Sequence, residues 1–373
     1  MKLLPATAAA LIVAMVAPAL AASAPAASAL EAGHVDNSLG LEDAPSAEPV
    51  EGGTDALSIS QDIFSHRDDA YGAFQRGYYL TALALALPRA EKADPAAQTL
   101  IAEIYAKGLG VAENVARASG WFQLAAKNGD SNAAFELGML YLQGDGVPKN
   151  PGRAAQLFKQ AADKGHPEAE YNLALMHADG LDASPSLSDA AKLMQLAADS
   201  GLAEAQYDYG QMQIQGSGVA PNSQAGAKEI GLAAAQGLVA AQIDYATLLY
   251  LGQGVPKSLH DAVGWYQRAA NVGNPVAQNR LAKLYAVGEG VPLDLKQAAM
   301  WRALARRQGL TDPLTDKLLV SIMPADLAAA EELARFWPDQ PPTSADAAGP
   351  ASKLAPDPDP KAAAAAAASA AGT

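Results

Sequence analysis

A period of 36 residues runs through the middle of the chain and limits its possible folds more than any other feature. Two series of glycines and two series of alanines keep this step over six consecutive units. Such an array predicts small structural repeats, because each repeat can bury its apolar face only against its neighbours. The glycine series are Gly108, Gly144, Gly180, Gly216, Gly252 and Gly288, and Gly129, Gly165, Gly201, Gly237, Gly273 and Gly309.

Each unit is predicted to contain two helices. In the second unit, apolar residues spaced for one buried helical face run over 133–142 and 154–164. Gly144 and Gly165 are expected to end these helices, since glycine enters the left-handed region without a steric cost. Recurring alanines such as Ala133 allow the two helices to pack closely. With only 6% aromatic residues and abundant alanine, the chain suits an all-α fold better than a β-sandwich.

The period also sets the predicted domain organisation. Six units are expected, with helical caps at residues 60–94 and 311–337 that cover the two apolar ends of the array. The C-terminal cap is predicted to contain helices over 314–323 and 326–337. The third and fourth units are less regular, and Glu229 and Ile230 stand where other units carry an aromatic residue. The six units are residues 95–130, 131–166, 167–202, 203–238, 239–274 and 275–310.

The first 21 residues have the pattern of an export signal. A lysine at position 2 precedes an apolar run to about Ala17, and Ala19-Leu20-Ala21 resembles a small-residue cleavage site. Cleavage after Ala21 is predicted, with Ala24 as the alternative site and a short membrane anchor as the alternative role. Residues 22–59 and 338–373 are poor in large apolar residues and are predicted to be disordered. The chain is therefore expected to be periplasmic or secreted.

Charge and cysteine content exclude several kinds of protein. The net charge of -14 and the absence of a basic cluster argue against nucleic acid as a partner. Residues 22–60 carry seven acids and no Lys or Arg. The chain has no cysteine, which excludes disulfides, thiolate metal sites and a lipid-bearing cysteine. Protein or peptide partners remain, and the sequence does not indicate an oligomeric state.

No catalytic residue, metal site or cofactor is predicted. The histidines are dispersed and no HExxH pair occurs, so a transition-metal site is not expected. The recurring Gly-x-Gly-Val-Pro segments lack the GK[ST] ending of a phosphate loop and are interpreted as connections between helices. The chain is therefore predicted not to be an enzyme. The five histidines are His34, His66, His166, His177 and His260.

The sequences of residues 133–148 and 277–292 resemble the Sel1-like repeat, a relative of the tetratricopeptide repeat. Both follow Ala-x-Tyr-x-Leu-Ala/Gly-x-Leu/Met-Tyr-x-x-Gly-x-Gly-Val-Pro, with Phe135 and Asn279 in place of the first Tyr. The resemblance implies a right-handed α-solenoid of antiparallel helix pairs whose first helices line a concave groove. It also implies a scaffold or adaptor, here for proteins of the cell envelope. A periplasmic regulator that sequesters a sensor kinase, as in rhizobia, and a cell-wall-modifying enzyme are the alternatives.

By analogy with tetratricopeptide repeats, the groove is expected to bind a partner through side chains at i and i+4 of the first helices. Aromatic anchors there would contribute most of the affinity. The alternative is that Tyr171 and Tyr207 pack between adjacent units. The predicted groove residues are Phe135, Met139, Leu142, Tyr171, Leu175, Tyr207, Gln211, Ile214 and Tyr250.

Overall fold

The computed structural model describes residues 69–181 and 185–339, and these contain α-helices and no strands. The predicted export signal, acidic linker and C-terminal tail lie outside the described residues, as do residues 60–68 of the predicted N-terminal cap. The helices are α1 (Asp69–Gln75), α2 (Tyr79–Ala90), α3 (Pro95–Ala106), α4 (Val115–Lys127), α5 (Ser131–Gln143), α6 (Pro151–Ala162), α7 (Pro167–Asp179), α8 (Leu187–Asp199), α9 (Ala203–Gln215), α10 (Ser223–Ala235), α11 (Val239–Leu251), α12 (Leu259–Asn271), α13 (Pro275–Val287), α14 (Leu295–Arg307), α15 (Pro313–Leu318) and α16 (Pro324–Phe336).

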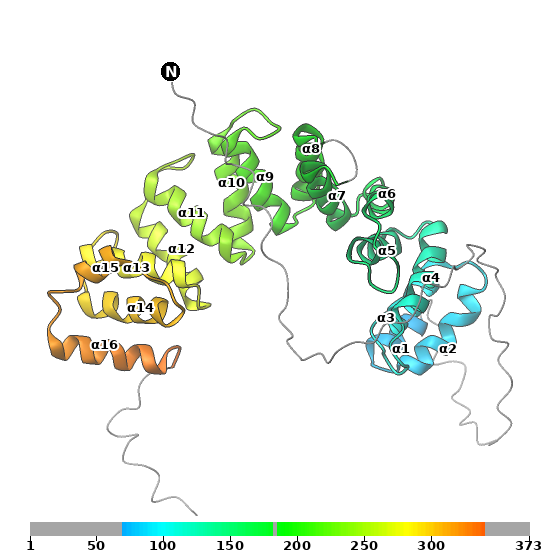
Figure 1. Cartoon of the computed structure of the whole chain (residues 1–373), viewed down its shortest axis with the longest axis horizontal. Helices are drawn as coiled ribbons and strands as arrows, with labels where there is room; N and C mark the ends of the chain where they lie inside the picture. The colour runs from blue at the N-terminus through cyan, green and yellow to red at the C-terminus, as the bar shows by residue number, and fades with distance from the viewer. Residues whose placement is uncertain (1–68, 182–184, 340–373) are drawn as a thin grey trace, which may run out of the picture. The chain divides into compact units, whose positions relative to one another are not determined.

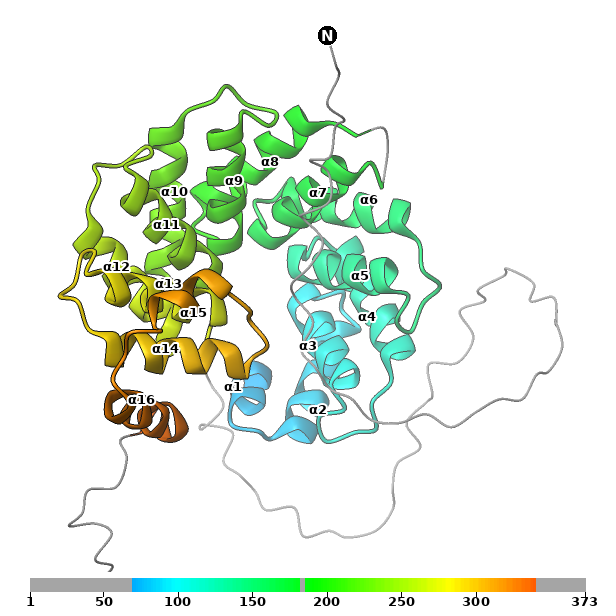
Figure 2. The ribbon, with the colours of Figure 1, turned by 60° about the vertical axis from the view of Figure 1, so that its left-hand side comes forward.

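Successive helices pack in pairs, and each pair packs on the next (Figure 1). Helices α3 and α4 form the first pair, and α13 and α14 form the sixth. In Figure 2 the first helices α5, α7, α9 and α11 lie on the inner side of the row, and their second helices lie on the outer side. The all-α solenoid of antiparallel helix pairs predicted from the repeat is confirmed.

The helix bounds differ from the predicted ones by a few residues, because polar caps outside the apolar pattern start the helices. Helix α6 begins at Pro151 because the side chain of Asn150 accepts a hydrogen bond from the Arg153 N–H. The same cap recurs at each second helix, a periodic signal that the apolar pattern did not reveal. Two predicted C-terminal ends were wrong, since α6 ends at Ala162 and α15 ends at Leu318. The capping residues are Asn114, Asn150, Ser186, Asn222, Ser258 and Asp294.

The loop glycines end helices and also allow adjacent units to come into close contact. Gly144 adopts φ +82° at the end of α5, as predicted. Gly146, two residues later, lies against the start of the preceding second helix, where an added Cβ would be 2.8 Å from the Ala116 nitrogen. Gly290 meets the Leu259 carbonyl in the same way. The Gly-x-Gly spacing therefore reflects a close contact between units.

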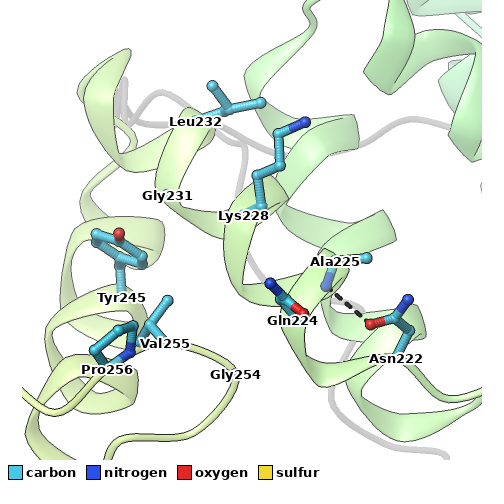
Figure 3. Close-up of a pocket in the computed structure, with 10 residues that line it drawn as sticks. All are labelled: Asn222, Gln224, Ala225, Lys228, Gly231, Leu232, Tyr245, Gly254, Val255 and Pro256. Carbon is cyan, nitrogen blue, oxygen red and sulfur yellow. Dashed lines mark hydrogen bonds between the residues drawn. The ribbon is translucent and has the colours of Figure 1, made fainter.

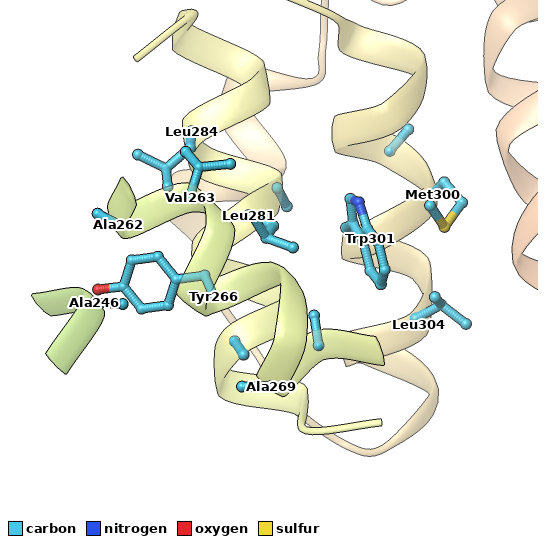
Figure 4. Close-up of a cluster of buried hydrophobic side chains, with 14 of the residues drawn as sticks. Ala246, Ala262, Val263, Tyr266, Ala269, Leu281, Leu284, Met300, Trp301 and Leu304 are labelled. Atoms are coloured by element: carbon cyan, nitrogen blue, oxygen red, sulfur yellow. The ribbon is translucent and has the colours of Figure 1, made fainter. Parts of the chain in front are cut away.

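The core consists of small residues where helices cross and large ones between the crossings. Ala133 and Ala161, from the two alanine columns, are fully buried, as predicted. Toward the C-terminus, α11 to α14 enclose a cluster that includes Tyr266, Leu281 and Trp301 (Figure 4). Because the alanines let the backbones approach closely, a modest number of large side chains fills the remaining space.

The fourth unit is packed differently from the others. Gly210 on α9 and Gly226 on α10 stand where the other five units carry alanine at most of the equivalent positions. A Cβ on Gly210 would lie 2.7 Å from the Gly226 carbonyl oxygen, and one on Gly226 would overlap the Gly210 carbonyl. The two helices thus approach through bare backbone, and Ile230 fills a position that holds Phe158 in the second unit.

A ladder of side-chain amides joins successive units. Gln206 donates through Nε2 to the Ala198 carbonyl of the preceding unit, at 3.4 Å. Its Oε1 accepts from Gln236 Nε2 at 2.7 Å, and Gln236 also donates to the Gly201 carbonyl. The same arrangement recurs around Gln98 and Gln278, with Asn128 and Gln308 as donors. One buried amide therefore connects the second helices of two units.

The second and third units break this ladder, since Ala134 and Glu170 occupy the glutamine column. Glu170 is 4% exposed, and its Oε2 is buried without a hydrogen-bond partner. An ionised carboxylate has no hydrogen to donate to the backbone carbonyl that accepts from the glutamine in the units that carry one. Burial accordingly raises the pKa of Glu170.

A buried arginine closes the C-terminal end of the array. Arg302 is 2% exposed and stands in the column of Phe122 and Phe158. It binds both carboxylate oxygens of Asp316, at 2.7 and 3.0 Å, and donates to the Leu310 carbonyl. The guanidinium lowers the pKa of Asp316. The predicted cap thus contains α15 and α16, and α15 is held by an ion pair.

Replacing Gly226 with alanine is expected to destabilise the chain by about 1–3 kcal/mol, because the new methyl group would overlap the backbone of α9. Gly264→Ala is the matched control, since Gly264 lies in α12 with open space around it. The control is expected to stabilise by up to about 1 kcal/mol, through the better helix propensity of alanine. Urea unfolding followed by circular dichroism measures both, and equal effects would contradict the close approach.

Glu170→Gln is expected to raise the free energy of unfolding by about 1–2 kcal/mol at neutral pH, since the amide can donate to the preceding unit. The folded chain keeps the Glu170 proton to a higher pH than the unfolded chain does. The stability of the wild type therefore rises as the pH falls through the folded pKa, and the advantage of the variant shrinks. Urea titrations from acid to neutral pH measure this. The reverse change, Gln206→Glu, is expected to destabilise, and a stabilising effect would contradict the ladder.

Candidate protein-binding face

Each first helix buries one side and exposes the opposite side. In α5 the buried positions are spaced as one helical face, at about 100° per residue. The positions on the opposite side, and their equivalents at steps of 36 residues in the other first helices, are called the inner face below. In α5 the buried residues are Ala133, Ala134, Leu137 and Gly138, and the inner-face residues are Asn132, Glu136, Met139 and Gln143.

All nine predicted groove residues are half-buried. Three of them, Met139, Leu175 and Gln211, lie at the centre of the inner face. The other six border it. Phe135 stacks on His166 at 4.8 Å between ring centroids and also contacts Phe158 at 5.8 Å. The column of Glu136, Asn172, Asp208 and Asp244 was not among the predicted residues, although its three acids at multiples of 36 residues were a readable signal.

Tyr171 and Tyr207 both reach into the next unit. The Tyr171 hydroxyl donates to Asp208 Oδ2 at 2.9 Å, and the Tyr207 hydroxyl donates to Asp244 Oδ2 at 2.8 Å. Burial and the adjacent carboxylate raise the pKa of each tyrosine, so both hydroxyls remain donors at neutral pH. These contacts give the tyrosines the packing role between units that the sequence left open. Partner binding by them stays a prediction.

Gln211 extends this network across the middle of the inner face. Its Nε2 donates to the Tyr207 hydroxyl at 2.8 Å and to Asp244 Oδ2 at 2.9 Å. At the border, the Tyr250 hydroxyl donates to Glu289 at 2.6 Å, and the Lys257 ammonium lies 5.7 Å from the Tyr250 ring centre. The inner face therefore combines a fixed polar network with the apolar side chains of Met139 and Leu175.

The inner face ends in a basic stretch at the sixth unit. Asn279 takes the column of Phe135 and donates to Asp312 Oδ2 at 2.7 Å, and Lys283 pairs with the same carboxylate at 2.6 Å. These contacts lower the pKa of Asp312, with the lysine as the main cause. Asp312 caps α15, so the contacts of Asn279 and Lys283 join α13 to the C-terminal cap.

A pocket of about 670 Å³ opens on α10 and the loop after α11 (Figure 3). Gly231 has no side chain to cover the ring edge of Tyr245 there, whereas its equivalents in the other units all carry a side chain. Lys228 is the only titratable cation in the lining, and no carboxylate accompanies it. The lining therefore offers one ammonium group and one phenol, without a carboxylate.

Within residues 69–181 and 185–339, no three His, Asp or Glu residues are grouped so that they could hold a metal ion. None of the helices described is long and apolar enough to cross a membrane.

The family model of the Sel1 repeat matches this chain six times. The matches cover residues 95–130, 131–166, 167–202, 203–237, 239–274 and 275–310, which is more than half of the chain. A search of curated proteins finds no match.

Two solved structures share this fold. One is a protective antigen present in uropathogenic Escherichia coli strains, which displays an SLR fold. It is 26% identical with a TM-score of 0.60, and the match covers 68% of this chain but only 56% of the antigen. The other is a Sel1 repeat protein from Oxalobacter formigenes, 28% identical with a TM-score of 0.58, over 64% of this chain and 98% of that one.

Sel1 repeat proteins are generally protein-interaction scaffolds and are typically non-catalytic. The six matches confirm the resemblance to the Sel1-like repeat that the sequences of residues 133–148 and 277–292 indicated. They include the irregular third and fourth units of the chain. This chain belongs to the Sel1 repeat family.

Proposed function

We propose that this chain is a non-catalytic scaffold that binds proteins of the cell envelope through its inner face. One observation carries the proposal. The same four positions are turned away from the core in α5, α7, α9, α11 and α13, so five units offer a continuous row of side chains that packing leaves available, whereas Leu100 at one of these positions in α3 is buried. Met139 and Leu175 lie in the middle of this row, where a partner would remove them from water.

The predicted export of the chain is the reason for proposing partners in the cell envelope. It rests on residues 1–21, whose charged start, apolar run and small-residue end are typical of a cleaved signal. The absence of cysteine is compatible with an oxidising compartment, since no thiol is available for unwanted pairing. Sequestering a signalling protein is a special case of the same binding activity.

The groove variant Met139→Ala/Leu175→Ala/Gln211→Ala is expected to lose the bound partner in affinity capture from an envelope extract. These changes remove side chains at the centre of the inner face without touching the buried alanines. The loss of binding free energy is expected to reach about 2 kcal/mol or more if one of the three side chains is a hot spot for the partner.

The matched control is Gln123→Ala/Lys159→Ala/Gln195→Ala, three exposed positions at 36-residue steps on the second helices. Circular dichroism checks that both variants keep their helicity and melting temperature. A partner that is retained by the groove variant and lost by the control would move the binding site to the outer side.

Expression of the full chain in a bacterium is expected to give a mature protein that begins at Ala22, in the periplasm or the medium. Mass spectrometry of the intact protein and cell fractionation measure this. Leu11→Arg is the control, because a charge in the apolar run should prevent export and leave the chain uncleaved. A wild-type chain that keeps Met1 in the cytoplasm would rule out the proposed location.

A further inference from the structure

The charges of the repeat units are separated between the first and the second helices. Five consecutive first helices, α3, α5, α7, α9 and α11, contain eight acids and no Lys or Arg. Seven of these acids lie on the inner face, and Glu170 is the buried exception. The seven are Glu103, Glu136, Glu168, Asp179, Glu204, Asp208 and Asp244.

The second helices show the opposite balance. The six helices α4, α6, α8, α10, α12 and α14 contain eleven Lys or Arg and four acids. The acidity of the inner face therefore does not simply follow from the net charge of the chain. The four acids are Asp189, Asp199, Glu229 and Asp261.

Among the described inner-face acids, Glu103 is the one in an ion pair with Lys or Arg, and the charge of Lys107 also acts on Glu136. Glu103 is paired with Lys107 at 3.3 Å, and Asp208 and Asp244 accept hydrogen bonds from tyrosine hydroxyls, which carry no charge. Glu136 and Glu204 are exposed, and Glu168 lies 3.2 Å from His166, whose Nδ1 accepts the Ala169 N–H. Since adjacent first helices bring like charges together, the approach of a cationic partner lowers the electrostatic free energy of this face.

The acidic stretch has a defined end. Helix α13 carries Arg280 and Lys283 at inner-face positions, so the sign of the face reverses at the sixth unit. Between α5 and α11, Met139 and Leu175 lie within the acidic surface. A matching segment therefore needs Lys or Arg together with apolar side chains, over the length of four units.

We infer that the inner face of α5, α7, α9 and α11 binds a Lys- or Arg-rich, partly apolar segment of another protein. This inference rests on the proposed scaffold function and names the chemistry of its partner. The chain's own residues 22–60 are not suitable occupants, because they carry seven acids and no Lys or Arg. The same charge separation leaves the outer side without comparable attraction for a cation.

The test uses two fluorescent amphipathic peptides that differ only in charge, one with Lys and Leu at helical spacing and one with Glu in place of Lys. Fluorescence anisotropy with the full mature chain is expected to show binding of the Lys peptide that weakens at high salt, and no binding of the Glu peptide. Glu136→Gln/Glu168→Gln/Glu204→Gln should weaken binding roughly tenfold, from three partly screened charge pairs.

The control variant, Asp163→Asn/Asp199→Asn/Glu332→Gln, removes the same charge at exposed positions away from the inner face. It is expected to change the affinity by less than about twofold. Equal loss in the two variants, or equal binding of the two peptides, would overturn the inference. The inference would also be overturned if the chain bound to itself and the Lys peptide failed to displace that self-association.

The fate of the scaffold proposal is separate from this outcome. If the groove variant Met139→Ala/Leu175→Ala/Gln211→Ala loses its captured partner while the Lys peptide does not bind, the inner face binds proteins and the charge argument is wrong. If neither the partner nor the peptide depends on the inner face, both proposals fail.

Discussion

The close approach of the two helices in each pair is the constraint on which the rest of the structure depends. It requires alanine or glycine at the crossing, and the buried Ala133 and Ala161 satisfy it. Where the fourth unit replaces alanine by Gly210 and Gly226, the backbones come into direct contact, and a smaller Ile230 suffices beside them. Small residues thus fix the spacing within a pair, and the large residues adapt to it.

The arrangement between pairs depends on polar contacts in addition to packing. The amide of Gln206 connects two second helices, and the hydroxyl of Tyr207 connects two first helices. These two connections lie on different sides of the first helix. Because buried hydrogen bonds depend strongly on geometry, they define the angle between units more narrowly than apolar contacts alone would.

Much of the fold could be predicted from the sequence, because its strongest signals are periodic and local. Glycine at 36-residue steps marked the helix ends, and Gly144 adopts the expected left-handed conformation. The ends of α6 and α15 were missed by a few residues, since caps and turn geometry decide them. The buried ion pair of Arg302 could not be predicted from the sequence, because only the tertiary structure brings this residue to Asp316. For the candidate face, the sequence placed Met139 and Leu175 on the exposed side of the first helices, where the structure also has them, but the acid Glu136 was not among the predicted residues, since the helical orientation was inferred by analogy.

The hydrogen bonds between units join residues that are at most about one repeat apart, such as Tyr171 with Asp208 and Gln278 with Gln308. The sequence separation of the stabilising contacts is thus set by the repeat and does not grow with the length of the array. Since folding rates fall as contacting residues become more distant in sequence, the chain can carry a long recognition surface without the slow search of a globular domain of equal size. Surface length and folding speed are in this way independent, and units can be added during evolution without slowing the folding of those already present.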